Sequence, residues 1–416
     1  MRGDIRVLRE IAAKYYAYAS SDENYEKMEL HRASNDMKSG TRPVVLLNEI
    51  PWNEFTGFEA LTPVCEDPVL RGIEMQMRQA IFQKEHFPAD MVIQPFIGIQ
   101  KIVMTEGPRG PVPVYTEIDR KSENQVQSHQ YATVFHSLED VEQIQPGRLI
   151  YDRHATMRLY ERIADAIGDI VPVKVTGMYA VMGIAHMPWD SLARLMSMDD
   201  LLFNMYDNPE LMHALIGRFT DVFLDRMRQY EELGLLEGDS FDLHCTPALS
   251  NDLKPDRDNV KLSQVWGRAA AQILGVVSPE MTDEFEIAYQ MRAMKPFGLV
   301  YYGCCEPLDR KIDIVEKIPN LRKITVTPWA DVNRAIEAIN GRFVVSAKAN
   351  PGLVSEASGL NMEAVTREIE TIVDACHRYH CTCDLVLKDI STVGGRIENL
   401  VEWEQAAMRL AAKYEP

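Results

Sequence analysis

Eight short runs rich in apolar and β-branched residues alternate with longer amphipathic segments from residue 43 to the end of the chain. The runs occupy residues 43–48, 90–96, 171–183, 239–245, 297–304, 322–327, 342–348 and 384–389. Repeated strand and helix units of this kind are typical of a parallel sheet joined by right-handed crossovers. Eight units predict one (β/α)8 TIM barrel, whose active site lies at the C-terminal ends of the strands.

Further patterns complete the predicted organisation. Residues 1–40 are polar and amphipathic, which indicates an N-terminal helical arm ahead of a barrel over residues 41–416. An insertion near residues 100–150 is expected after the second strand, because this stretch is rich in Pro, Gly and polar residues and suits a hairpin or lid. A long helical pattern after the third run is expected to divide into two helices at Asn208–Pro209.

The overall charge argues against nucleic acid as a partner. The 416 residues include 44 Lys and Arg against 62 Asp and Glu, a formal net charge of −18, whereas nucleic-acid binding depends on Lys and Arg contacts to phosphates. No apolar run reaches the roughly 18 residues of a membrane span, and the first residues lack the apolar core of a signal peptide. The seven unevenly spaced cysteines are expected to be free thiols in a reducing cytoplasm.

Two thiols end the fifth run, in the sequence Tyr301-Tyr302-Gly303-Cys304-Cys305-Glu306. Thiolates at the mouth of a barrel are natural zinc ligands or nucleophiles. Because neighbours on a strand face opposite ways, one cysteine is expected to pack in the barrel wall. We assign the catalytic role to Cys305.

The fourth run ends Asp242-Leu243-His244-Cys245. Strand alternation predicts that Asp242 and His244 face one side and that Cys245 faces the other. With the fourth strand beside the fifth, His244 and Cys305 could share a metal ion, and Asp242 could act with them in catalysis. The alternative is that His244 is a structural histidine with its hydrogen bonds satisfied.

Other side chains are candidates for substrate binding because they end strands or follow them directly. They are Glu49, Trp52, His186, Tyr302, Lys348 and Lys388. The lysines could instead pair with a neighbouring carboxylate, and Glu49, Trp52 and His186 could merely cap the barrel. A second cluster, Cys376 to Cys383, is expected at the N-terminal face of the barrel and outside the site.

Four pieces of the chain carry a family resemblance. They read ELHRASNDMKSGTRPVVLLNEIPWNEF, HFPADMVIQPFIGI, DDLLFNMYDNPELMHALI and YYGCCEPLDRKIDIVEKIPNLRKITVTPWADV. At these residues the chain resembles the uroporphyrinogen decarboxylase superfamily, and more closely its branch of corrinoid-dependent methyltransferases. The resemblance covers most of the chain, and it identifies fold more specifically than reaction.

This resemblance implies transfer of a methyl group from a small methoxylated aromatic or methylamine donor to the cobalt of a separate corrinoid protein. It also implies a zinc ion in the barrel and a possible homodimer. Gly303 stands where the family has a zinc-binding histidine, and no cysteine follows the eighth run. The implied ligand set is therefore a substituted one, made of His244, Cys305, Glu306 and Asp389.

Two other classes of function stay open at this point. One is a decarboxylase or lyase that acts on a small carboxylated substrate through acid and base groups such as Asp242 and His244. No arginine-rich motif that would hold propionate groups lies around residues 51–58, which argues against uroporphyrinogen itself. The other is a barrel that binds a ligand without catalysis.

Overall fold

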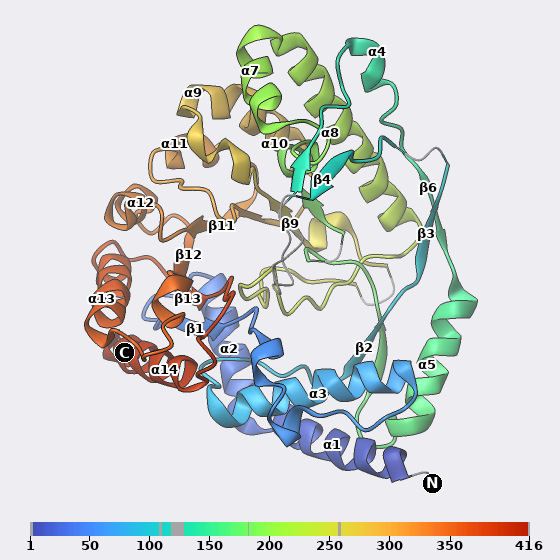
Figure 1. Ribbon diagram of the computed structural model, residues 1–416, viewed down its shortest axis with the longest axis vertical. Helices are drawn as coiled ribbons and strands as arrows, with labels where there is room; N and C mark the ends of the chain where they lie inside the picture. The colour runs from blue at the N-terminus through green and yellow to red at the C-terminus, as the bar shows by residue number, and fades with distance from the viewer. Residues whose placement is uncertain (1–2, 108–109, 118–128, 182, 257–258, 415–416) are drawn as a thin grey trace.

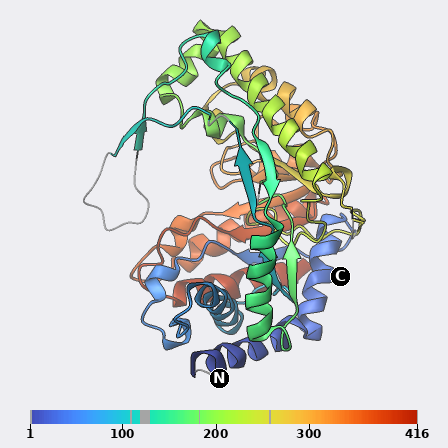
Figure 2. The ribbon, with the colours of Figure 1, turned by 90° about the vertical axis from the view of Figure 1, so that its right-hand side faces the viewer.

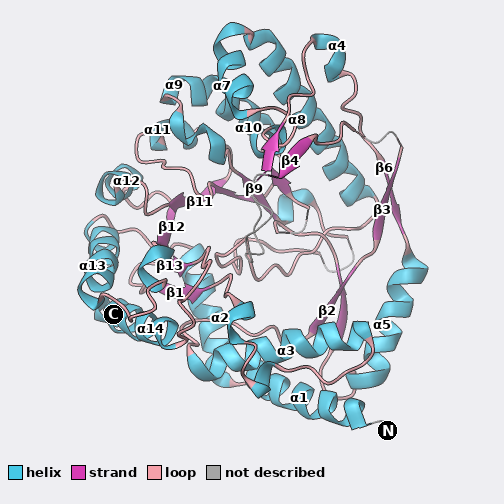
Figure 3. Cartoon of the chain, in the orientation of Figure 1, coloured by secondary structure: helices cyan, strands magenta, loops and turns pink. Residues whose placement is uncertain are grey.

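A seven-stranded sheet with all neighbouring strands parallel forms the centre of the protein, in the order β1-β13-β12-β11-β10-β9-β8. The computed structural model describes residues 3–107, 110–117, 129–181, 183–256 and 259–414. The strands are β1 (Val44–Leu47), β8 (Ala185–His186), β9 (Trp266–Ala269), β10 (Leu299–Tyr302), β11 (Leu321–Val326), β12 (Val344–Ala349) and β13 (Cys383–Leu387). Figure 3 shows them as an arc with helices outside it.

A separate parallel pair lies across from this arc. It is formed by β2 (Ile97–Gln100) and β7 (Val173–Thr176), and a single parallel bridge from Met178 to Leu236 extends it. The predicted parallel α/β class is thus confirmed. Among the described residues, the parallel ladders join seven strands into an arc and join β2 to β7 as a pair. They do not establish a closed ring of eight strands.

Helices cover the outer side of the strands (Figure 1). The first six are α1 (Gly3–Ala19), α2 (Asp22–Asn35), α3 (Pro68–His86), α4 (Leu138–Val141), α5 (Arg153–Ile167) and α6 (Pro188–Leu192). The next four are α7 (Met198–Asp207), α8 (Pro209–Glu232), α9 (Pro279–Thr282) and α10 (Ala288–Ala293). The last four are α11 (Ile312–Val315), α12 (Val332–Ile339), α13 (Met362–Arg378) and α14 (Glu398–Ala411).

Local chemistry accounts for several helix boundaries. The carboxylate of Asp67 accepts hydrogen bonds from the first backbone N–H groups of α3, and Ser197 caps α7 in the same way. The predicted break at Asn208–Pro209 separates α7 from α8, because proline disfavours a helical conformation in the residue before it. No helix in the described part of the chain combines the length and the low polarity needed to cross a bilayer.

The first forty residues and the stretch after β2 match the predicted pattern of local structure. Helices α1 and α2 come before β1. After β2, the strand β3 (Val103–Glu106) pairs antiparallel with β6 (Arg148–Tyr151), and β4 (Tyr115–Glu117) pairs antiparallel with β5 (His129–Tyr131). The β4–β5 pair projects away from the rest of the fold in Figure 2. The division into an arm, a barrel and an insertion stays a prediction.

Two of the eight predicted strands are wrong. Residues 90–96 are not a strand, because the Asp90 carboxylate accepts hydrogen bonds from Arg42 and from the backbone of Val45, and the strand begins only at Ile97. Residues 239–245 also form no strand, and β9 takes their expected place beside β10. The other six predicted runs each overlap an observed parallel strand.

The segment that includes residues 242–249 instead packs against the inner face of the arc, where a buried ion pair holds it. Lys323 of β11 and Asp384 of β13 form this pair, and both side chains are 0% exposed. Thr246 donates a hydrogen bond to Asp384 and accepts one from Ser346 of β12. Ser34 of α2 donates to the other oxygen of Asp384. One carboxylate therefore joins the sheet, α2 and the interior segment.

The substitution Lys323→Met tests how much the buried pair of Lys323 and Asp384 stabilises the fold. The substitution leaves Asp384 buried without its cation, and the expected loss is about 3–5 kcal/mol of unfolding free energy. Urea denaturation followed by circular dichroism measures it. The control is Lys317→Met, which removes an exposed pair with Asp283 and should cost less than about 1 kcal/mol. Equal, small losses in the two variants would contradict the structural role of the buried pair.

Candidate functional site

Sulfur and charged groups meet at the carboxyl ends of β10 and β13. The two sulfur atoms of Cys304 and Cys305 are 3.7 Å apart, and Lys388 Nζ lies 3.9 Å from each of them. Asp389 forms an ion pair of 2.8 Å with Lys388 and lies 3.7 Å from the Cys305 sulfur. The structure thus brings Cys305, Lys388 and Asp389 together, as three of the residues chosen from sequence.

Both thiols face this cluster, whereas alternation predicted that one would face the wall. The reason is that β10 ends at Tyr302 and the chain turns at Gly303, which has φ +101°. A side chain at Gly303 would be strained at this φ, and its Cβ would lie 3.0 Å from side-chain atoms of Leu308 and Thr325. The alternation of side chains between the two faces of the strand therefore ends at Gly303, one residue before Cys304.

The surroundings of the two thiols shift their pKa values in opposite directions. A hydrogen bond joins the two sulfur atoms, either of which can donate, and this bond, together with His244 and the charges of Lys388 and Arg268, lowers the pKa of Cys304. The same hydrogen bond and burial raise the pKa of Cys305. The pair consequently favours a thiolate at Cys304 and a thiol at Cys305.

A candidate metal centre lies beside the thiol pair. Ligand atoms of Glu49, His244 and Cys245 all lie within 4.8 Å of one another. Carboxylate oxygen, imidazole nitrogen and cysteine sulfur are the three donor types that bind zinc in proteins. Burial is the main reason why the pKa of the Cys245 thiol is raised, and the charge of the Glu49 carboxylate raises it further. Binding of a cation by this sulfur would therefore release the thiol proton. The chemistry of the donors fits zinc.

This triad differs from the ligand set expected from sequence, since only His244 belongs to both. Cys305 and Asp389 face Lys388 instead. Both oxygens of the Glu306 carboxylate accept hydrogen bonds from backbone N–H groups, those of Ala271 and Cys304. Burial raises the pKa of Glu306 to about 7. Glu306 therefore holds the loop after β10 in place.

The prediction that Cys245 faces away from His244 is wrong, because the segment turns where a strand was expected. An antiparallel bridge joins Asp242 to Pro247, and His244 and Cys245 have φ of +65° and +63°. Glu49 and Asp389 also have positive φ. Such conformations are costly for residues other than glycine, and they concentrate at functional sites.

Three candidates from the sequence lie elsewhere. His186 is buried and bonded to Gln290 of α10, and the Tyr302 hydroxyl donates to Glu286, so both face the helices outside the sheet. Trp52 makes edge contacts with Phe55 and Phe82. None of the three forms a hydrogen bond with the thiol and metal-candidate groups in the described residues.

Two lysines and one unexpected arginine add positive charge to the interior. Lys348 is buried at the end of β12, and it lines a small cavity of about 70 Å³ with Lys388 and the two thiols. Asp242 lies near enough that the charge of Lys348 lowers its pKa, although burial raises it more. Arg268 of β9 was missed because the segment Trp266-Gly267-Arg268-Ala269 lacks an apolar alternation.

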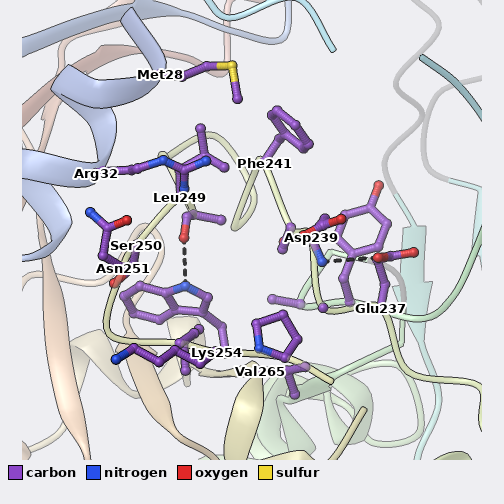
Figure 4. A pocket seen from close by; sticks show the side chains of 18 of the residues that line it. Met28, Arg32, Glu237, Asp239, Phe241, Leu249, Ser250, Asn251, Lys254 and Val265 are labelled. Atoms are coloured by element: carbon purple, nitrogen blue, oxygen red, sulfur yellow. Dashed lines mark hydrogen bonds between the residues drawn. The ribbon is translucent and has the colours of Figure 1, made fainter. Parts of the chain in front are cut away.

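A larger cavity of about 560 Å³ lies between α2 and the chain around residues 237–255 (Figure 4). Met28 and Arg32 line it from α2, and Trp266 lines it from β9 and donates a hydrogen bond to the Ala248 carbonyl. The thiols, His244 and the lysines at the strand ends are not among its lining residues. This cavity is therefore distinct from the candidate site.

Comparisons with known proteins give little further information. No family model matches the sequence, and no curated protein matches it. Among solved structures, the chain is similar to a methyltransferase from Methanosarcina mazei at 11% identity and a TM-score of 0.48, covering 94% of this chain and 99% of that one. A likeness this distant does not bear on activity, so function must follow from this chain's own residues.

Cysteine substitutions distinguish the two ligand sets. Cys245→Ser should weaken zinc binding by about 100-fold or more, because it removes a ligand outright. Cys305→Ser should change the affinity less than Cys245→Ser does, since the Cys305 sulfur faces Lys388 and Asp389 and is not one of the three candidate ligands. Competition with a chromophoric chelator measures both constants. Cys376→Ser, in the remote cysteine cluster, serves as the control. The opposite order of effects would restore the ligand set expected from sequence.

Proposed function

We propose that this protein transfers a methyl group from a small methoxylated aromatic or methylamine donor to the cobalt of a corrinoid carried by a separate protein. The observation that carries the proposal is the meeting of a thiol pair, Lys388 and the Glu49, His244 and Cys245 triad at the strand ends. We further propose that the arc and the β2–β7 pair belong to one (β/α)8-type barrel, with this site at its mouth.

Methyl transfer from oxygen or nitrogen needs help for the departing atom, because an alkoxide or amide leaves poorly. A zinc ion held by Glu49, His244 and Cys245 would supply Lewis acidity to that atom. Asp242 is suited to deliver a proton to it, since burial raises the pKa of this carboxyl group. The carbon–oxygen or carbon–nitrogen bond breaks, the cobalt of the partner gains the methyl group, and the departing atom takes the proton.

The lysines support a second candidate function. Lys348 and Lys388 are both buried and both line the small cavity at the strand ends. Paired ammonium groups bind carboxylates, so a decarboxylase or lyase acting on a small carboxylated substrate is the alternative. In that reaction Asp242 would protonate the carbon that loses carbon dioxide.

The test is a methyl-transfer assay with a reduced corrinoid protein and a panel of aromatic methyl ethers and methylamines. Visible absorbance reports conversion of cob(I)alamin to methylcobalamin. We expect turnover only when the methyl donor and the reduced corrinoid protein are both present. The turnover rate of His244→Ala should fall by about 100-fold or more, because the variant removes a group needed to stabilise developing charge.

The matched control is His186→Ala, whose imidazole lies behind the sheet and should matter far less for turnover. Carbon dioxide is measured in the same reactions with carboxylated compounds. Release of carbon dioxide without methylation of the corrinoid would overturn the methyltransferase proposal in favour of the alternative.

A further inference from the structure

Trp329 is an exposed tryptophan at the edge of the small cavity at the strand ends. It lies in the loop between β11 and α12 and is 64% exposed. Together with the two thiols, Lys348 and Lys388, it lines the cavity of about 70 Å³. Single exposed aromatic residues are common, and Phe203 of α7 is another, but Phe203 does not line this cavity. Trp329 thus presents an aromatic ring to solvent directly beside the candidate site.

The loop that carries Trp329 is fixed on both sides. The Ala330 N–H donates a hydrogen bond to the Thr327 carbonyl, which closes a four-residue turn, and Pro328 within this turn has a restricted φ. Asp331 then caps α12 by accepting a hydrogen bond from a backbone N–H of that helix. A ring on a loop held in this way loses little conformational entropy when a ligand packs on it.

Two hydrogen-bond donors that line the same cavity have capacity left over. Thr327 is 1% exposed, and its hydroxyl has no hydrogen-bond partner in the part of the chain that the structure describes. The buried ammonium group of Lys348 carries three N–H donors, and among the described residues it donates one hydrogen bond, to the Ser346 hydroxyl. Buried polar groups without partners are unfavourable. The cavity therefore fits a ligand group that accepts hydrogen bonds.

The neighbouring acidic groups do not supply this acceptor. Asp389 forms its ion pair of 2.8 Å with Lys388. Burial raises the pKa of Asp242 more than the charge of Lys348 lowers it, and within the described ranges no ion pair or hydrogen bond joins Asp242 to Lys348. Both thiol sulfurs lie 3.9 Å from Lys388 Nζ. An acceptor for Thr327 and Lys348 can therefore come from a bound ligand.

Polar and aromatic surfaces thus border one space. Its volume of about 70 Å³ exceeds that of a single water molecule and holds a small polar substituent. Thr327 and Lys348 line its buried part, and Trp329 lines its exposed edge. An aromatic ring packed on Trp329 gains more than the burial of its area alone. A protonated methylamine has no acceptor to offer the two donors, whereas a substituted aromatic ring has one.

We propose that Trp329 binds the aromatic ring of the substrate and that Thr327 and Lys348 donate hydrogen bonds to an oxygen substituent of that ring. The three residues form an aromatic subsite, and Trp329 determines its specificity. The choice of methyl donor rests on the proposed function, in which this subsite selects a methoxylated aromatic compound over a methylamine. Binding of the aromatic ring itself does not depend on the reaction.

Ligand-observed NMR titration compares binding of 4-methoxyphenol with that of its saturated analogue 4-methoxycyclohexanol. The wild-type protein should bind the aromatic compound about threefold to tenfold more tightly, because only this compound forms a ring pair with Trp329. Trp329→Leu should lose the preference, and Trp329→Phe should keep most of it. Phe203→Leu, which removes an exposed ring of α7, is the control and should leave it unchanged. No preference in the wild type, or an unchanged preference in Trp329→Leu, would overturn the proposal.

Substitution of Thr327 tests the polar part of the subsite and separates binding from folding. Thr327→Val removes a hydroxyl without a partner, so the thermal midpoint of unfolding should stay unchanged or rise, while the affinity for 4-methoxyphenol should fall about threefold or more. Lys348→Met should lower this affinity as well. Thr325→Val is the matched control, because the Thr325 hydroxyl is hydrogen-bonded to Tyr301 at 2.5 Å. It should lower the midpoint and leave binding unchanged. Equal affinities in wild type and Thr327→Val would contradict the assigned donor.

An exposed tryptophan can also belong to a protein-docking surface, and the same variants recognise that case. Binding of the corrinoid protein is measured without a methyl donor, in wild type and in Trp329→Leu. If the substitution weakens this binding and leaves the affinity for 4-methoxyphenol unchanged, Trp329 contacts the partner and the aromatic subsite is overturned.

Failure of the proposed reaction can be recognised separately. If 4-methoxyphenol binds through Trp329 but no donor methylates the corrinoid, the methyltransferase proposal fails and the subsite stands. If methylamines methylate the corrinoid equally fast in wild type and in Trp329→Leu, and 4-methoxyphenol does not bind, the subsite fails and the reaction stands.

Discussion

The buried pair of Lys323 and Asp384 is the interaction on which the arrangement of the site depends. Its carboxylate binds Thr246 of the interior segment and Ser34 of α2, and Lys323 also donates to the Pro247 carbonyl. Asn35 of α2 adds hydrogen bonds to the carbonyls of Pro247 and Leu249. With the segment held from both sides, the turn just before Thr246 places His244 and Cys245 near Glu49 at the end of β1.

The same constraint explains why charge accumulates inside the arc. The interior segment brings polar groups such as His244 and Thr246 into space that a barrel core would fill with branched apolar residues. The inner positions of the strands therefore carry Lys323, Ser346, Lys348 and Arg268. Asp384 balances the charge of Lys323 and Asp389 balances that of Lys388, whereas no carboxylate in the described residues forms an ion pair with Lys348.

Sequence patterns predicted the parts of the fold that local chemistry determines. The Asn208–Pro209 break falls where it was expected, because proline acts on the residue before it whatever the tertiary context. Six strands follow from β-branched runs that are buried on both faces. Residues 239–245 failed because their conformation depends on contacts with distant residues such as Asp384. No local signal reports such contacts.

The site was predicted in part for the same reason. Placement at strand ends brought Glu49, His244, Cys305, Lys388 and Asp389 into consideration, and the structure brings these side chains near one another. The rule that side chains alternate between the two faces of a strand gave the wrong direction for Cys304 and Cys245. Strand geometry ends at Gly303, just before Cys304, and at the turn after Asp242, just before Cys245. Arg268 was not singled out from sequence, because the segment that includes it lacks the apolar alternation of a strand.

X-ray absorption at the zinc edge, on protein loaded with one equivalent of zinc, tests most directly whether the interior segment builds the site. The account predicts one sulfur ligand, one imidazole and further light-atom ligands, with the sulfur lost in Cys245→Ser. A spectrum with two or more sulfur ligands, unchanged by that substitution, would place the metal on the thiol pair and contradict the account.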